Sequence, residues 1–378
     1  MLNVAIVGPG LVGKELLHQL NSHATHAAKV NSQVVQLPVV GIINSRRMLL
    51  GPVTPDGKRA PLPSLGAWAD QLQGESNAST AASLSAFVDE LVATHQPTVV
   101  VDCTSSLEVA QQYPAWLAKG LHVVTPNKKG FSSEWSLYEA ITKHSRLGNA
   151  SDPTAPWVYH ESTVGAGLPV LNSLYDLVKT GDEIVKIEGI FSGTLSYLFN
   201  EFSSPTAGAS ATKSFSDIVT VAKSLGYTEP DPRDDLNGMD VARKVTILAR
   251  VAGLKVSLDD LAVENIVPEA LRSAPSPDAF MQQLPDFDAH FSDLNDQAQH
   301  SKTVLRYVGV VDPKGQSSVK LMKYPVDHPF ANLKGSDNII AFTTKYFPNP
   351  LIIQGAGAGA AVTAFGIFSD IIKVAERV

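Results

Sequence analysis

The chain has 378 residues, 44% of them hydrophobic and 18% charged, with a formal net charge of −7. This length indicates roughly two domains, and the acidic balance offers no basic face to nucleic acid or an anionic membrane. The single cysteine, Cys103, excludes an internal disulfide and a thiolate-rich metal site. The start, MLNVAIVG, lacks the basic region of a signal peptide, and no apolar run reaches the ~20 residues of a membrane span. We therefore expect a cytoplasmic protein without nucleic-acid or membrane partners.

The first predicted element is a buried strand at residues 2–7, which leads into Gly8-Pro9-Gly10-Leu11-Val12-Gly13 and a helical pattern. Strand, G-x-G-x-x-G and helix in this order form the fingerprint of a dinucleotide-binding domain. Gly8 makes the tight turn, Gly10 lets the backbone approach the pyrophosphate, and Gly13 permits close packing of the helix on the strand. The pattern predicts a bound nucleotide; the alternative is a glycine-rich turn without a ligand.

The next predicted strand, residues 34–43, ends at Asn44 and is followed by Arg46 and Arg47. NAD-specific domains usually carry an acidic residue at this strand end, whereas an arginine pair suits a 2′-phosphate. We therefore expect NADP(H) to be accepted, and the preference between NADP(H) and NAD(H) stays open. Two solvated loop arginines are the alternative.

Polar loops follow two further predicted strands. Thr104 and Ser105 come after the strand at residues 98–102, and Lys128 comes after the strand at residues 121–125. Doubly wound sheets bind ligands at the carboxyl ends of their strands. We expect the two hydroxyls to contact the nucleotide and Lys128 to point towards the nicotinamide; a solvated loop lysine is the alternative.

A predicted strand at residues 157–160 precedes a glycine-rich loop, residues 161–169, that contains one carboxylate, Glu161. Inward-pointing carbonyls together with a carboxylate suit a hard cation. A plain turn before a helix is the simpler interpretation of the pattern alone.

The stretch Gly226 to Lys244, GYTEPDPRDDLNGMDVARK, follows a predicted strand at 184–191, small donors at Ser192-Gly193-Thr194, and helices at about 195–204 and 214–225. We predict a helix from about Leu236 with Asp234 or Asp235 as its N-cap, which places Asp240 and Lys244 on one face. Carboxylates crowded around one ammonium suit a substrate amino group and a proton donor. The alternative is a well-capped helix with a solvated ion pair.

The remaining pattern predicts a second domain of the α+β class. Polar helices are expected at 265–300, strands at 304–311, 319–322, 338–344 and 351–353, and a glycine-rich entry at 354–364 into a last helix ending near 374. We predict a Rossmann-type nucleotide-binding domain at 1–155, with 355–378 packing back on it. Residues 156–354 are predicted to form a substrate-binding, catalytic and dimerisation domain with a mixed or antiparallel sheet.

Six motifs resemble the homoserine dehydrogenases of the fungal, monofunctional type, in register over nearly the whole chain: GPGLVG, TPNKKGFSS, YHESTVGAGLPV, IEGIFSGTLSYLFNEFS, LGYTEPDPRDDLNGMDVARKVTILAR and IQGAGAGAAVTA. The resemblance implies NAD(P)H-dependent, reversible reduction of L-aspartate 4-semialdehyde to L-homoserine, on the route to threonine, methionine and isoleucine. It also implies a homodimer formed through the sheet of the second domain.

The resemblance also assigns residues. Lys244 matches the proton donor and Lys128 a second lysine near the reacting oxygen. Glu229 and Asp240 match positions that hold the substrate, with Tyr227 and Asp235 lining the site, and we add Gly193 and Thr194 to this group. Glu161 and the carbonyls of Val164, Ala166 and Leu168 match a monovalent-cation site for Na⁺ or K⁺. Nucleotide contacts match Gly10, Leu11, Val12, Thr104, Lys128, Gly226 and Gly359.

The predicted chemistry needs a cation that can give a proton, because negative charge grows on the aldehyde oxygen as hydride reaches the carbonyl carbon. Lys244 and Lys128, one from each domain, fit that need. A phosphorylating aspartate-semialdehyde dehydrogenase is one rival, and it would require Cys103 as its nucleophile. A nucleotide-sensing protein without catalysis is the other, and it would tolerate the loss of both lysines.

Overall fold

The computed structural model describes residues 1–30, 35–74, 79–205 and 213–378. These form two compact units, one of residues 1–167 together with 359–378 and the other of residues 168–358. We describe each unit by itself.

The first unit is built on a seven-stranded sheet with the order β4-β3-β2-β1-β5-β6-β7. Five strands are parallel: β1 (Asn3–Val7), β2 (Val39–Ile43), β5 (Thr98–Asp102), β6 (His122–Val124) and β7 (Val158–Tyr159). At one edge, β3 (Arg47–Leu50) and β4 (Ser79–Ala81) are antiparallel. Every residue of β1, β2 and β5 is buried, which explains their continuous apolar sequences.

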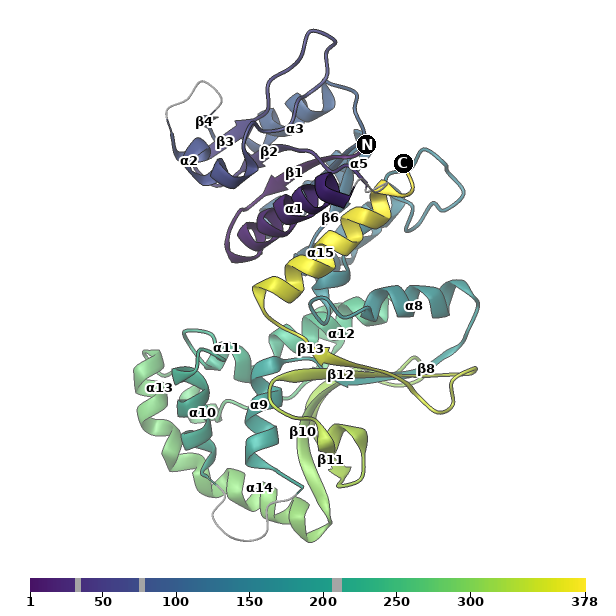
Figure 1. The fold of residues 1–378 in the computed structure, drawn as a ribbon. Helices are drawn as coiled ribbons and strands as arrows, with labels where there is room; N and C mark the ends of the chain where they lie inside the picture. The colour runs from purple at the N-terminus through teal and green to yellow at the C-terminus, as the bar shows by residue number, and fades with distance from the viewer. Residues whose placement is uncertain (31–34, 75–78, 206–212) are drawn as a thin grey trace. The chain divides into compact units, whose positions relative to one another are not determined.

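Helices surround this sheet, and the last helix of the chain returns to it. They are α1 (Leu11–Val30), α2 (Trp68–Gln73), α3 (Leu84–Val92), α4 (Leu107–Ala110), α5 (Tyr113–Ala118), α6 (Lys129–Ser132), α7 (Trp135–Lys143) and α15 (Ala360–Ala375), with short 3₁₀ turns at Leu65–Ala67 and Glu161–Thr163. Figure 1 shows α15 beside α1. Ile367 and Ile371 of α15 lie in the same apolar cluster as Val4 and Ile6 of β1, so residues distant in sequence complete one core.

The second unit has a six-stranded sheet with the order β13-β12-β8-β10-β11-β9. Its strands are β8 (Ile184–Ile190), β9 (Ala262–Val263), β10 (Thr303–Val311), β11 (Ser318–Pro325), β12 (Asp337–Thr344) and β13 (Leu351–Ala356). All neighbouring pairs are antiparallel except β9 and β11, so the sheet is mixed. Every described helix of the chain is too short or too polar to cross a lipid bilayer.

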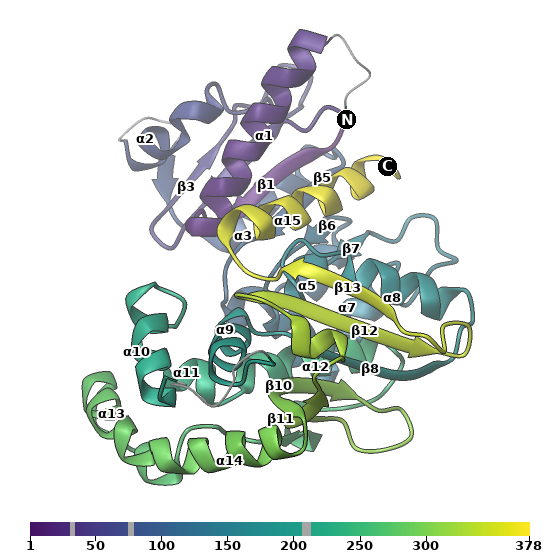
Figure 2. The same cartoon turned by 60° about the horizontal axis from the view of Figure 1, so that its bottom comes forward.

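The helices of the second unit are α8 (Val170–Lys179), α9 (Gly193–Phe202), α10 (Phe215–Ser224), α11 (Arg233–Leu236), α12 (Met239–Val251), α13 (Pro277–Gln283) and α14 (Asp288–His300). In the described part of this unit, 3₁₀ turns at Leu258–Asp260, Glu269–Leu271, Leu284–Phe287 and Pro329–Asn332 lie in the connections between these helices and strands. Figure 2 shows α9 and α12 close to the sheet, and both contact β10. From Lys244 to its end, α12 is buried on all sides, as expected for a helix in the centre of a domain.

A buried arginine holds this unit together. Arg306 on β10 is 1% exposed and donates to five backbone carbonyls, those of Phe199, Ser203, Leu305, Phe330 and Ala331. Burial lowers its pKa to about 10, so it remains charged at neutral pH. The guanidinium therefore ties α9 and the turn before β12 to the centre of the sheet.

Two sequence predictions need correction. The helix expected from about Leu236 begins at Met239 as α12, and the short helix α11 precedes it, separated from it by Asn237 and Gly238. Neither Asp234 nor Asp235 is an N-cap, because Pro232 precedes α11 and Gly238 precedes α12. Gly238 has φ 76°, and a Cβ there would lie 2.0 Å from the Tyr307 hydroxyl, so this left-handed position admits only glycine.

Other boundaries also differ. The second strand begins at Val39, and residue 34, where it was expected to begin, lies outside the described residues. The units divide at 167/168 and 358/359, whereas the sequence placed the boundaries at 155/156 and 354/355. The shift at the first boundary has a clear reason, because β7 pairs with β6 and the Glu161 amide donates to Asp370 of α15.

Candidate active site

The glycine-rich loop of the first unit has an open backbone above a helix N-terminus. Gly8 has φ 81°, and a Cβ there would lie 2.4 Å from Cγ2 of Thr104. A Cβ on Gly13 would lie 2.7 Å from the Gly8 carbonyl, whereas one on Gly10 would meet no atom within 4 Å. Leu11 begins α1 and is 82% exposed, with Val12 half-buried beside it. This arrangement leaves room for a phosphate at the positive end of α1.

Asn44, at the end of β2, organises the turn that carries the two arginines. Its Oδ1 accepts the amides of Arg46 and Arg47, both at 2.8 Å. Arg46 is exposed, whereas Arg47 is half-buried because it begins β3. The amide of Gly8 donates to the carbonyl of Ile43, so this turn lies next to the glycine-rich loop.

A buried carboxylate connects the loops that follow β5 and β6. Asp102 is fully buried, and its Oδ1 accepts the Thr104 amide at 2.7 Å. Its Oδ2 accepts the Asn127 Nδ2 at 2.9 Å and also accepts the Tyr113 hydroxyl. Burial, reinforced by the charge of Asp102, raises the pKa of Tyr113 well above its usual range, so the phenol stays a donor. Asp102 thus fixes the backbone at Thr104 and at Asn127, the residue before Lys128.

The other predicted nucleotide residues are distributed around these loops and beyond them. Ser105 lies between Thr104 and Ser106, whose amide donates to the Thr104 hydroxyl at 3.1 Å. Lys128 is half-buried, and its carbonyl starts α6 by accepting the amides of Phe131 and Ser132. Gly359, with φ 111°, precedes α15, whereas Gly226, with φ 73°, belongs to the second unit, at the end of α10.

The loop predicted to hold a cation is compact and largely buried. Glu161 is 4% exposed, Val164 is fully buried and Ala166, with φ 53°, is 6% exposed. Leu168, whose carbonyl accepts the Val170 amide, is the first residue of the second unit. Within the described ranges, no three His, Cys, Asp or Glu side chains group in a way that suits a metal, and a site made mainly of carbonyls does not need such a group.

In the second unit, hydrogen bonds join four of the predicted substrate residues. The Thr194 hydroxyl lies 2.6 Å from the Tyr227 carbonyl and 2.9 Å from Oδ1 of Asp235, and Oδ2 of Asp235 accepts the Glu229 amide at 2.8 Å. Burial is the main cause that raises the pKa of Asp235, and the charges of Glu229 and Asp240 raise it further. The fold therefore brings the charges of Glu229 and Asp240 near Asp235, which itself contacts the Thr194 hydroxyl.

Lys244 lies one helical turn from Asp240, as the spacing predicted. Its Nζ is 2.7 Å from Oδ2 of Asp240 and 2.6 Å from the Phe191 carbonyl. The same carbonyl accepts Nδ2 of Asn338 at 3.1 Å. The lysine is 8% exposed, whereas Asp240 is exposed, so only the ammonium of this pair is shielded from solvent. Phe191 directly precedes Ser192, which caps the helix carrying Gly193 and Thr194.

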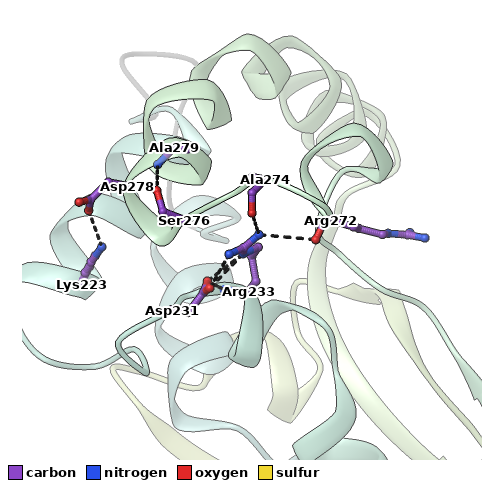
Figure 3. Close-up of polar contacts among 8 residues, drawn as sticks. All are labelled: Lys223, Asp231, Arg233, Arg272, Ala274, Ser276, Asp278 and Ala279. Atoms are coloured by element: carbon purple, nitrogen blue, oxygen red, sulfur yellow. Dashed lines mark hydrogen bonds and ion pairs between the residues drawn. The ribbon is translucent and has the colours of Figure 1, made fainter.

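Arg233 anchors the segment that carries Glu229 and Asp235. Its guanidinium donates to the Asp231 carboxylate and to the carbonyls of Ala274 and Arg272, as Figure 3 shows. The close approach to Asp231 lowers the pKa of that carboxyl. This clamp holds the turn before α11 against the chain that leads to α13.

Three of these residues escaped sequence reasoning. Asp102, Phe191 and Asn338 act through hydrogen bonds to residues distant in the sequence, which their local sequence does not predict. Asp102 carried a weak signal, since a carboxylate ending a buried strand requires donors. The Phe191 carbonyl carried none.

Two family models match the chain. The model described as the homoserine dehydrogenase NAD-binding domain matches residues 8–151, and the model of homoserine dehydrogenase matches residues 169–372. The chain belongs to the homoserine dehydrogenase family. The sequence prediction of this family is thereby confirmed, as is the fold class of a nucleotide-binding domain followed by an α+β domain.

Individual relatives agree with the family models. A homoserine dehydrogenase of Schizosaccharomyces pombe is 46% identical over 380 residues, which cover 100% of this chain and 96% of that protein. A bifunctional aspartokinase/homoserine dehydrogenase of Zea mays is 48% identical over 99% of this chain, which spans only 38% of that protein's length.

Solved structures share the fold of this chain. A Candida auris protein of unknown function, 44% identical, matches with a TM-score of 0.88 over 100% of this chain and 98% of its own. A mutant of a hyperthermophilic archaeal homoserine dehydrogenase in complex with NADPH, 25% identical, matches with a TM-score of 0.70 over 100% of this chain and 99% of its own.

The thiol that the rival dehydrogenase requires is poorly suited to attack. Burial strongly raises the pKa of Cys103, and the adjacent charge of Asp102 raises it further. The thiolate is the nucleophilic form of cysteine, so this residue is nearly inactive at neutral pH. The site chemistry therefore favours a homoserine dehydrogenase over a phosphorylating aspartate-semialdehyde dehydrogenase.

Proposed function

We propose that the chain catalyses the NAD(P)H-dependent, reversible reduction of L-aspartate 4-semialdehyde to L-homoserine. The observation that carries this proposal is the buried ammonium of Lys244, held between a carboxylate and a carbonyl beside a group of further carboxylates. Membership of the homoserine dehydrogenase family supports the same reaction.

The proposed substrate site lies in the second unit. Glu229 and Asp240 are both exposed, and we assign them to the α-ammonium and the neighbouring polar groups of the amino acid. Thr194 and Asp235 fix the Glu229 backbone through the hydrogen bonds described above. Tyr227, which is 44% exposed, packs edge-to-face on Tyr197 at a centroid distance of 5.0 Å and lines the same turn.

Lys244 is the proposed proton donor. A bound nicotinamide supplies the hydride for the aldehyde carbon during reduction. The carbonyl oxygen then carries negative charge, and the ammonium of Lys244 stabilises this charge and transfers a proton to it. Asp240 and the Phe191 carbonyl keep the ammonium in one position. We assign Lys128 to the same oxygen as a second cation.

The proposed nucleotide site uses the first unit. The open backbone at Gly10 and the start of α1 suit the pyrophosphate, and Thr104 and Ser105 follow β5 at the carboxyl edge of the sheet. Arg46 and Arg47 after β2 suit a 2′-phosphate, which supports NADP(H) as an accepted cofactor. Replacing both arginines by alanine should raise the KM for NADPH at least about 10-fold and leave that for NADH within about 2-fold.

A monovalent cation is the second proposed ligand. The carboxylate of Glu161 and the carbonyls of Val164, Ala166 and Leu168 are oxygen donors of the kind that hard cations prefer. We expect Na⁺ or K⁺ to raise activity in the wild type. A Glu161→Gln variant that responds to these ions as the wild type does would contradict this assignment.

We further propose a homodimer in the cytoplasm. The second sheet ends at β13, which has one strand neighbour and exposes Ile352 by 40%. The single cysteine of the chain suits a reducing compartment. Size-exclusion chromatography with light scattering would measure twice the chain mass for a dimer.

Replacing Lys244 tests the proposed reaction. We expect Lys244→Ala to lower kcat for homoserine oxidation by about 10²–10⁴-fold while the dissociation constant for NADPH stays nearly constant. Lys223→Ala is the matched control, because this lysine of the same unit lies outside the proposed site residues and forms a loose ion pair with Asp278 at 3.8 Å.

Homoserine oxidation is followed by absorbance with NAD⁺ and with NADP⁺, each with and without Na⁺ or K⁺. Wild-type turnover in Lys244→Ala would remove Lys244 from the mechanism. A wild-type chain that binds NADPH but oxidises no homoserine would instead favour the nucleotide-sensing protein.

A further inference from the structure

The first unit has a pocket on the edge opposite its predicted nucleotide site. It lies where three parallel strands begin, because Pro97 precedes β5, His122 begins β6 and Trp157 precedes β7. The loops proposed to contact the nucleotide follow the other ends of β5 and β6. We call this pocket of about 420 Å³ the amino-edge pocket.

The side chains of the amino-edge pocket are positively charged. Lys119, Arg146 and Arg377 line it together with His95 and His122, and none of the described lining residues is Asp or Glu. This composition is unusual in a chain with a formal net charge of −7. A local group of cations on an acidic protein is a feature that attracts an anion.

The charge of Arg146 is not matched by a hydrogen-bonded carboxylate in the described contacts. Its Nε donates to the Ala155 carbonyl at 3.3 Å and its NH2 to the Pro153 carbonyl. The guanidinium carbon lies 4.8 Å from the ring centroid of Trp157, and that of Arg377 lies 5.6 Å from the same ring. The indole therefore holds two guanidinium groups in place at little entropic cost.

The other two cations are partly compensated. Lys119 forms an ion pair with Asp89 at 2.6 Å, and Arg377 lies 3.9 Å from Glu376, but neither carboxylate lines the pocket. Arg377 also donates to the Lys373 carbonyl at 2.7 Å. Hydrogen bonds from Thr154, and to a smaller extent the charge of Arg146, lower the pKa of the Asp152 carboxyl, so Arg146 too has a carboxylate nearby. Asp152 does not line the pocket either, so all three cations face a pocket whose described lining residues include no Asp or Glu.

His122 supplies a second, independent observation. It is only 9% exposed and lines the pocket, and its Nδ1 accepts the Trp157 amide at 2.9 Å. Burial, together with the charge of Arg146, lowers its pKa to about 4, so the ring is neutral at pH 7. A neutral imidazole that accepts at Nδ1 carries its proton on Nε2. The described contacts give that N–H no protein acceptor, so an anion in the pocket would be a suitable one.

We propose that the amino-edge pocket binds a small phosphate-type anion of two or more charges, through Arg146, Arg377 and the Nε2–H of His122. Guanidinium groups recognise phosphate oxygens in pairs, and the pocket volume falls in the range of small-molecule sites. This site is separate from the proposed reaction, which uses the opposite edge of the sheet.

Calorimetric titration of the full chain with inorganic pyrophosphate tests the proposal. Saturating NADP⁺ is present so that the phosphate positions of the nucleotide are filled, and the ionic strength is held constant. We expect one pyrophosphate per chain and about 10- to 100-fold weaker binding in Arg146→Gln. The matched control is Arg272→Gln, because this exposed arginine also donates to a carbonyl, that of Val267, but its own pocket contains Glu264 and Glu269.

Two results would overturn the proposal: the same affinity in wild type and Arg146→Gln, or no binding by the wild type at millimolar pyrophosphate. If Arg146→Gln does not fold, Arg377→Gln takes its place with the same expectation.

The natural ligand could be a phosphorylated metabolite or a free inorganic anion, and comparing the affinities of ribose 5-phosphate and orthophosphate distinguishes the two. Tighter binding of the ester indicates a phosphorylated metabolite, and the reverse order indicates a free inorganic anion. Binding only to long polyanions such as RNA would refute a small-molecule site.

Discussion

Replacing Asp235 by asparagine should make the protein more stable and less active. The Thr194 hydroxyl has one proton but lies within hydrogen-bond distance of two acceptors, the Tyr227 carbonyl at 2.6 Å and Oδ1 of Asp235 at 2.9 Å. When Asp235 is ionised, one of these contacts brings two acceptors together. With asparagine at position 235, the side-chain NH₂ donates to the Thr194 oxygen, and the Thr194 hydroxyl then donates to the Tyr227 carbonyl. The side-chain carbonyl of the asparagine still accepts the Glu229 amide.

The magnitude follows from these contacts. An unsatisfied buried contact costs about 1–3 kcal/mol, and we take the lower part of that range because Asp235 is only half-buried. The charge-assisted bond from the Glu229 amide weakens by about 1 kcal/mol when its acceptor becomes neutral. Removing the repulsion from Glu229 and Asp240 adds a further gain. We expect a net stabilisation of about 1 kcal/mol, or a rise in Tm of about 2–4 °C.

The gain should depend on pH. The pKa of Asp235 in the folded protein is raised above its ordinary value of 3.8, so the folded state binds the proton of this carboxyl more tightly than the unfolded state does. Protonation therefore stabilises the fold fully below about pH 3.8, and this stabilisation is lost as pH rises through the pKa of the folded state. The variant should therefore exceed the wild type at pH 7 and approach it at pH 4. The KM for homoserine should rise at least about 10-fold, because the carboxylate that helps to shape the substrate site is gone.

Thermal unfolding at pH 4 and pH 7 measures the stability, and initial rates of homoserine oxidation measure the KM. Asp234→Asn is the control, because this neighbouring carboxylate is exposed and should change neither quantity. A variant destabilised at pH 7, or a gain equal at both pH values, would refute the hydrogen-bond argument.

Three further substitutions test the framework of the two units. Arg306→Met leaves carbonyls of the second unit without their buried donor and should lower the free energy of unfolding in urea by about 3 kcal/mol or more. Gly8→Ala forces a Cβ against Thr104 at a positive φ and should raise the dissociation constant of NADPH, measured by fluorescence, by at least about 10-fold. Tyr113→Phe removes one donor from buried Asp102; we expect a loss of about 2 kcal/mol in stability and a higher KM for the nucleotide, with kcat nearly unchanged.

The elements that sequence predicted best are those with a strong local pattern. The strand at 98–102 has the predicted bounds, because five consecutive residues are buried between helical layers. The helix expected at about 195–204 is α9, which begins two residues earlier, at Gly193, because the Ser192 hydroxyl accepts the Leu195 amide and caps it. The contact between Lys244 and Asp240 follows from helical spacing alone.

Predictions failed where a distant contact decides the local structure. The break before α12 depends on Gly238, whose backbone passes so close to Tyr307 that no side chain fits. The short strands β3 and β4 have weak patterns of their own and exist because they extend a sheet already formed by β2. Their pairing also places Arg47 in a strand, where sequence indicated a loop.

The sequence by itself determined the family, the two kinds of sheet and the residue types of the candidate site, because apolar periodicity, glycine spacing and motif identity are all local properties. Only the tertiary structure decided which atoms meet. The Phe191 carbonyl reaches Lys244 across 53 positions of the chain, and Thr194 reaches Asp235 across 41. Such contacts leave no mark on nearby residues, since a single hydrogen bond across packed elements depends on the whole fold and not on the composition around it.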